Sequence, residues 1–314
     1  MTLGYLERLV IQALSAHALA SAVAALAVGV TWRHVAATAS PSVTAERIFL
    51  MRLMPSLLGG LTALLVAVAY TLWETRVEVE RAGVLGLTLA AAGLVLVGTA
   101  LWRALVAMWR TWSVRRTLVR SSGTRLPAVP LRAYVVESRF PVVALVGLVM
   151  ARLFVARRVI DACTTDEFDA VIAHEQAHAR HRDNLRRMAM TAAPDPLGLL
   201  PAGRQMQQAW LRASELAADE WAAGRTNGVL LASALVKVAR LATTPPEPFP
   251  ASALYSGEPI TERVHRLLEP VPAAAPQPLP QWLRATACVA LVAAALIALP
   301  AIHVVAERLL QWGP

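Results

Sequence analysis

One stretch, GVLGLTLAAAGLVLVGTALWRALVAM at residues 83–108, is 26 residues long and has a single charged side chain, that of Arg103. A helix needs about 20 predominantly apolar residues to cross the hydrocarbon core of a bilayer. Trp102 and Trp109 lie near the end of the stretch, and amphipathic indole rings prefer the headgroup region of a membrane. The stretch therefore predicts a transmembrane helix.

Three further stretches support the same prediction, at residues 9–31, 53–73 and 283–305. Apolar residues make up 56% of the 314-residue chain, above the roughly 45–50% of an ordinary globular protein. The first stretch could instead be a signal peptide, although its apolar run exceeds the typical length of about 7–15 residues. We expect a mostly α integral membrane protein with four transmembrane helices, and a multi-pass location in the cell membrane.

The charges between these stretches predict how the chain crosses the membrane. Residues 109–127 contain five arginines and no acid, residues 32–52 contain three arginines and one glutamate, and residues 74–82 contain three glutamates and two arginines. Because arginine-rich loops stay in the cytoplasm, the first two segments are predicted inside and the third outside. We expect three spans within residues 1–110, a cytoplasmic domain at 111–280, and the fourth span with a short tail at 281–314. The net charge of +9 comes largely from arginines that flank the apolar spans, so we expect the lipid bilayer to be their partner and expect no direct contact with nucleic acid.

The predicted cytoplasmic domain combines strands and helices. Residues 140–156 could form a fifth span, but Pro141, Gly147 and Arg152 favour two short strands, at 142–146 and 153–155, with a turn near Gly147. A helix is predicted to follow Asp161, with Thr164 or Thr165 as its cap. Further helices are predicted at about residues 204–223, 230–241 and 260–268.

The chemical signal of the sequence is HEQAH at residues 174–178. Residues i and i+4 share one face of a helix, so His174 and His178 can bind the same metal ion. Zinc accepts imidazole nitrogens and tolerates an open position for water. Glu175 lies beside that position without being a ligand, and there it can act as general base toward the water. The chain has two cysteines and no CxxC, so the metal must be held by histidine and carboxylate.

Residues outside HEQAH extend this prediction. Glu215 is a candidate third metal ligand, and Asp219, four residues later, is a candidate acceptor for the free N–H of a ligand imidazole. Both could alternatively be solvated acids. His181 could stabilise the transition-state oxyanion, or could simply be a solvated interfacial histidine. His17, within the first span, is a functional candidate by its position, although a histidine satisfied between helices is the simpler reading. The arginines at 180, 182, 186 and 187 could bind lipid headgroups or an acidic substrate, or could form a solvated basic face.

The segment HEQAHARHRDNLRRM, followed about 30 residues later by ELAADEWAA, resembles the gluzincin pattern HExxH…ExxxD. Two membrane groups share this pattern, the BlaR/MecR-type antirepressor peptidases and the HtpX/CAAX-prenyl-protease type. The predicted order of spans resembles the BlaR/MecR arrangement more closely, and ITERVHRLL at residues 260–268 resembles the "I..R...L" helix of these families. About nine residues follow the last predicted span, so we expect no extracellular penicillin-binding sensor.

The resemblance implies a cytoplasmic α+β zincin-like metallopeptidase domain between the third and fourth spans, with Zn²⁺ as cofactor. It assigns His174, His178 and Glu215 as ligands, Glu175 as general base and Asp219 as their support. It implies a membrane-bound metalloendopeptidase that cleaves a protein or peptide at the cytoplasmic face, with a transcriptional repressor as one possible substrate. Two alternatives are an HtpX-type quality-control protease and a non-catalytic membrane transducer that keeps zinc for structure.

Overall fold

The computed structural model describes residues 3–36, 40–73, 83–126, 129, 131–138, 141–241, 260–269, 301 and 304. Its first three helices are α1 (Leu3–Ala36), α2 (Pro41–Trp73) and α3 (Val84–Arg120), and all three are long and apolar enough to cross a membrane. Three of the four predicted spans are therefore confirmed as apolar helices, each longer than predicted. The fourth, at 283–305, lies outside the described residues apart from Ala301 and Val304.

A small mixed sheet follows α3. Its strands are β1 (Ser122–Leu126), β2 (Ala133–Val136), β3 (Val143–Val146) and β4 (Arg152–Ala156), in the order β1-β2-β4-β3. The pair β2–β4 is parallel, and β1–β2 and β3–β4 are antiparallel. Gly147 follows β3 with a φ of +124°, a conformation that glycine adopts readily. Residues 141–156 are thus confirmed as two strands with a turn at Gly147 in place of a fifth span, and residue 140 lies outside the described residues.

Helices make up most of the described chain after the sheet. They are α4 (Arg157–Ala162), α5 (Thr165–His181), α6 (Asp183–Ala192), the 3₁₀ turn η1 (Pro196–Gly198), α7 (Pro201–Ala223), α8 (Gly228–Leu241) and α9 (Ile260–Leu268). Thr164 caps α5 as predicted, in a capping box with Glu167. Arg182, with a φ of +54°, separates α5 from α6, a break that the sequence analysis did not predict.

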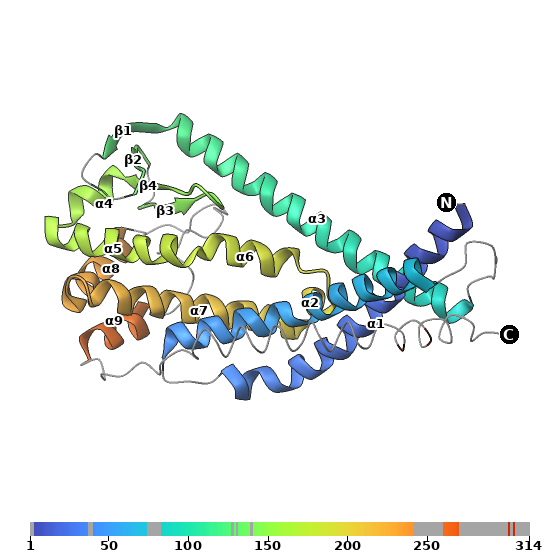
Figure 1. Cartoon of the computed structure of the whole chain (residues 1–314). Helices are drawn as coiled ribbons and strands as arrows, with labels where there is room; N and C mark the ends of the chain where they lie inside the picture. Colours follow the sequence, from blue (N-terminus) through green and yellow to red (C-terminus); the bar gives the residue numbers. More distant parts are fainter. Residues whose placement is uncertain are drawn as a thin grey trace.

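The core of this region encloses α5 between the sheet and α8. Val143 and Leu153 of the sheet, Val171 of α5, and Leu231 and Leu235 of α8 belong to one buried apolar cluster. Figure 1 shows the sheet, α5, α8 and α9 at one end of the molecule, and α1, α2 and α3 converging at the other. Because α5 is surrounded by these layers, its HEQAH segment lies in the interior.

A hairpin formed by α6 and α7 joins the two ends of the molecule (Figure 1). We call residues 193–200, between these helices, the α6–α7 corner. Apolar side chains of α1 and α2 pack against it and against α6 and α7 in a second buried cluster, which includes Trp32, Ile48, Met190, Leu197, Met206 and Trp210. Ala193, Asp195 and Leu197 of the corner are therefore buried against the candidate membrane helices.

Polar side chains from all three candidate membrane helices also bind the corner. His17 Nε2 of α1 lies 2.7 Å from the carbonyl oxygen of Pro194, and Arg103 of α3 donates to the carbonyl oxygen of Ala193 at 3.0 Å. From α2, Arg52 donates to both carboxylate oxygens of Asp195, at 3.0 and 2.9 Å, and the Ser56 hydroxyl donates to the same carboxylate. His17 is thus satisfied by the corner.

Candidate metal centre

Helix α5 brings the two histidines of HEQAH together. His174 and His178 are 0% and 6% exposed, and their Nε2 atoms lie 3.1 Å apart. This spacing follows from the helical geometry that places residues i and i+4 on one face. The two imidazoles therefore present one nitrogen each to the same point in the interior.

Glu215 of α7 completes a group of three possible ligands. Its Oε2 lies 3.6 Å from His174 Nε2, and its Oε1 lies 3.6 Å from His178 Nε2. One ligand atom from each residue lies within 4.8 Å of the other two. Two ligands about 2.0–2.1 Å from a zinc ion at a tetrahedral angle are about 3.4 Å apart. The observed distances of 3.1 and 3.6 Å fit a zinc ion without rearrangement of the backbone.

Each imidazole has a carboxylate against its other nitrogen. His178 Nδ1 lies 2.6 Å from Asp183 Oδ2, a hydrogen bond in which the ring donates when Nδ1 carries the proton. His174 Nδ1 lies 3.0 Å from Asp219 Oδ1, a short contact that lacks the angle of a hydrogen bond in this conformation. A proton on Nδ1 leaves the lone pair of Nε2 for a metal, and a carboxylate partner fixes the orientation of the ring.

Asp183 was not predicted by the sequence analysis, which proposed Asp219 alone as a support for the ligand imidazoles. It is the first residue of α6, directly after the left-handed Arg182, and the chain turn at Arg182 returns it toward His178. An unbroken helix through HEQAHARHRD would place Asp183 on a different face from His178. The two side chains meet only because the helix breaks at Arg182. In the sequence, the available signal was an acid five residues after a candidate metal ligand.

Arg263 of α9 is the second residue that the sequence analysis missed. It is 2% exposed and donates to both carboxylate oxygens of Asp219 at 2.7 Å each. Its Nη1 atom also lies 3.2 Å from Glu215 Oε2. The "I..R...L" pattern at residues 260–268 predicted a helix but indicated no role for its arginine. Arg263 holds the two acids of α7 in place and partly neutralises them.

Glu175 differs from the other buried acids. It is 0% exposed, and neither of its carboxylate oxygens has a hydrogen-bond partner among the described residues. Burial raises the pKa of Glu175. A buried carboxyl with no protein partner is costly for folding, and such groups concentrate where they serve chemistry. A carboxylate of raised pKa beside a metal position is suited to exchanging protons with a water molecule.

The charge balance of the centre favours a bound cation. Burial acts to lower the pKa of His174, but contacts with Asp219 and Glu215 outweigh it and raise the pKa to about 9. Burial acts to raise the pKa of Glu215, yet the charge of His178 and the contact with His174 hold it below its ordinary value. Four carboxylates thus surround two imidazoles, and Arg263 is the guanidinium paired with two of them. A divalent ion held by the imidazoles and Glu215 would compensate this excess.

His181, the predicted oxyanion stabiliser, lies at the end of α5 and is partly buried. Burial lowers its pKa. It belongs neither to the three-ligand group nor to the hydrogen bonds that support it. Its role in catalysis stays a prediction.

Comparison with known proteins places these residues in a family context. The model of peptidase family M48 matches residues 109–271, a segment that contains HEQAH, Glu215, Asp219 and Arg263. No curated protein and no solved structure matches the chain. The matched segment begins inside α3 and ends just after α9.

Proposed function

The chain belongs to peptidase family M48, and from that premise we propose that it is a membrane-associated zinc metalloendopeptidase. The observation that carries the proposal is the buried group of His174, His178 and Glu215 with Glu175 beside it. Two imidazoles and one carboxylate form a ligand set of catalytic zinc sites, which keep one position free. A zinc ion bound there supplies a Lewis acid that acidifies water and polarises a peptide carbonyl.

The protein side chains have separate roles in this proposal. Glu175 accepts a proton from the attacking water, and afterwards returns it to the amine of the leaving peptide. Asp183 and Asp219 hold the imidazoles of His178 and His174 in the orientation that directs Nε2 into the centre. Arg263 keeps Asp219 and Glu215 charged despite their burial. The interior position of the centre excludes bulk water and strengthens each of these interactions.

The substrate and the orientation belong to the proposal as well. We place the peptidase region at the cytoplasmic face of the cell membrane, because arginine predominates in residues 109–127 and 32–52. The candidate substrates are a transcriptional repressor, by resemblance to the BlaR/MecR type, and a broad set of membrane proteins, by resemblance to the HtpX type. A non-catalytic transducer is disfavoured because a purely structural zinc site has no need of an unpartnered buried acid such as Glu175.

The proposal is tested by comparing cells that express the wild type, Glu175→Gln or the control Gln176→Ala. Gln176 is the neighbour of Glu175 and is only partly buried. Quantitative mass spectrometry measures which cellular proteins lose their intact form, and metal analysis measures zinc in the purified chains. We expect cleavage with the wild type and Gln176→Ala, no cleavage with Glu175→Gln, and the same zinc content in all three.

The substrate set separates the alternatives. Cleavage of one repressor supports the regulatory role, and cleavage of many membrane proteins supports quality control. Equal protein levels with wild type and Glu175→Gln would contradict the proposal and leave the transducer.

A further inference from the structure

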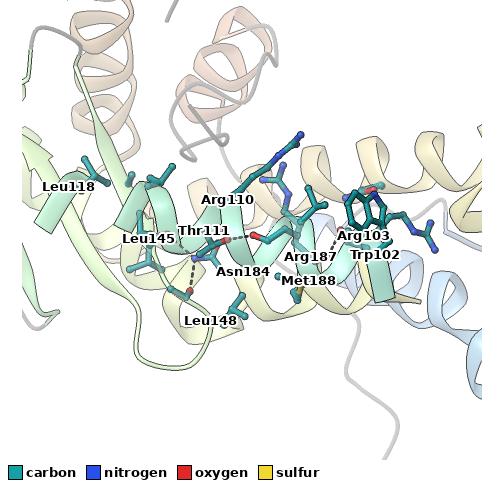
Figure 2. Close-up of a pocket in the computed structure, with 18 residues that line it drawn as sticks. Trp102, Arg103, Arg110, Thr111, Leu118, Leu145, Leu148, Asn184, Arg187 and Met188 are labelled. Carbon is teal, nitrogen blue, oxygen red and sulfur yellow. Dashed lines mark hydrogen bonds between the residues drawn. The ribbon is translucent and has the colours of Figure 1, made fainter. Parts of the chain in front are cut away.

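A cavity of about 430 Å³ lies between α3, the turn after β3, and α6. Figure 2 shows its lining, which includes Trp102, Arg103 and Arg110 of α3, Leu148 of the turn, and Arg187 and Met188 of α6. His174, Glu175, His178 and Glu215 do not line it. The cavity therefore has a lining of its own, although the charge of Glu215 in the candidate metal centre acts on Arg187.

The charged groups of the cavity are all positive. Arg103, Arg110 and Arg187 line it, and no aspartate or glutamate of the described part of the chain does. Arg103 donates to the α6–α7 corner, but the guanidiniums of Arg110 and Arg187 have no hydrogen bond or ion pair with a described residue. Burial lowers the pKa of Arg187. The charge of Glu215 partly offsets this effect on Arg187, but neither guanidinium forms an ion pair with a described carboxylate. Two guanidiniums at a cavity wall without such a pair indicate an anionic ligand.

The rest of the lining is largely apolar. Val106 and Val114 of α3, Leu145 and Leu148 beside the sheet, and Met188 of α6 contribute to it. A hydrated inorganic ion gains no binding free energy from such walls, because apolar surface is stabilised when other apolar groups cover it and exclude water. The lining therefore fits a molecule that joins an anionic group to a hydrocarbon portion.

The exposed surroundings of the cavity are of the kind expected at a membrane surface. On α3, Trp102, Trp109 and Trp112 are 69%, 65% and 55% exposed, and the turn after β3 exposes Val149 by 87% and Met150 by 71%. Exposed tryptophans on a candidate membrane helix are typical of the headgroup region. The cavity opens beside the part of α3 that leaves its apolar span, where phospholipid headgroups lie.

We propose that this cavity binds an anionic phospholipid, with its phosphate against Arg110 and Arg187 and its acyl chains along Val106, Leu148 and Met188. The charge complementarity of the arginines selects the phosphate, and the apolar walls select the hydrocarbon chains. A zwitterionic phospholipid brings a positive choline group toward the arginines and binds more weakly. An acidic peptide satisfies the arginines but leaves most of the apolar wall without contact.

The test measures lipid binding by the full chain purified in detergent. Phosphatidylglycerol and phosphatidylcholine with identical acyl chains are titrated, and bound lipid is counted by native mass spectrometry. Each arginine near a phosphate contributes roughly a fivefold factor in affinity. We expect Arg110→Gln to weaken phosphatidylglycerol binding about fivefold and Arg110→Gln/Arg187→Gln about thirtyfold. The control Arg240→Gln removes an exposed charge on α8 outside the cavity and should leave the affinity unchanged.

Arg110 is exposed, so its variant tests the site even if replacing the partly buried Arg187 impairs folding. Equal affinity for the two lipids, or an equal loss in Arg240→Gln, overturns the proposal. Binding of glycerol phosphate or of an acidic peptide as tightly as phosphatidylglycerol also overturns it, because each lacks the acyl chains.

Discussion

Replacement of Asp195 by leucine should destabilise the protein strongly, because it leaves a buried guanidinium without its partner. The side chains of Arg52 and Asp195 are 3% and 0% exposed, and Asp195 accepts hydrogen bonds from Arg52, from the Ser56 hydroxyl and from the backbone N–H of Gly198. Breaking a buried ion pair from one side typically costs about 3–5 kcal/mol. Each kcal/mol lowers the melting midpoint of a protein of this size by roughly 2–4 °C. We therefore expect a decrease of roughly 6–20 °C.

The double variant Arg52→Met/Asp195→Leu separates the cost of leaving one charge unpaired from the cost of losing the other hydrogen bonds. Replacing both partners by apolar side chains of similar volume is often close to neutral. Here Ser56, Gly198 and the carbonyl oxygen of Met190 lose partners, so a residual cost of about 1–3 kcal/mol is expected.

The assay is circular dichroism of the full chain in one detergent at one scan rate, for wild type, both single variants and the double variant. Because the corner joins α6, which carries Asp183, to α7, which carries Glu215, zinc content is measured in parallel and should fall with the melting midpoint. Additive effects of the two single changes would contradict an ion pair between Arg52 and Asp195, since independent side chains show no coupling.

Three further predictions concern the metal centre and the helices that surround it. Asp183→Ala removes the hydrogen-bond partner of His178 and should weaken zinc binding about 10–100-fold in a chelator competition, whereas a change below twofold contradicts the assigned role. Hydrogen bonds from Lys237, from a serine hydroxyl and from the backbone of the helix cap lower the pKa of Glu167 to about 2. Glu167→Gln removes the charge that these bonds stabilise, so the variant should be less stable by about 1–2 kcal/mol at pH 7. This value is reduced from the full effect of the pKa shift because Lys237 is partly exposed. This stabilisation is complete above about pH 4.5 and is lost as the pH falls toward 2, so melting curves of variant and wild type should converge there, and a constant difference contradicts the prediction. Gly203→Ala should lower stability by about 1–3 kcal/mol in the same melting assay, because a Cβ at this position meets the backbone carbonyl oxygen of Leu197; an unchanged midpoint contradicts it.

Much of the local structure could be predicted from the sequence because its causes are local. The three spans are apolar over more residues than a bilayer requires, and Thr164 with Glu167 forms a capping box within four residues. His174 and His178 are brought together by helix geometry alone. Glu215 lies on another helix, so helix geometry does not connect it to them; it was predicted from the ligand set of catalytic zinc sites, and the resemblance to a known motif supported it.

What the sequence did not reveal depends on contacts between distant residues. Arg52 and Asp195 are 143 residues apart, and no periodicity relates them. The insertion of the α6–α7 corner among α1, α2 and α3 is therefore visible only in the fold. Arg263 was missed because an arginine on a nine-residue amphipathic helix ordinarily faces solvent, whereas here it faces two buried acids. Asp183 was missed because the left-handed Arg182 breaks the helical period before it.

The metal centre is tested most directly by X-ray absorption at the zinc edge, with metal analysis, on the purified full chain and on Glu215→Ala. We predict one zinc per chain in the wild type, with nitrogen and oxygen ligands at about 2.0–2.1 Å and scattering from two imidazoles, and a large loss of zinc in Glu215→Ala. A wild type without bound divalent metal, sulfur ligands at about 2.3 Å, or unchanged coordination in Glu215→Ala would contradict the assignment of His174, His178 and Glu215 as the metal ligands.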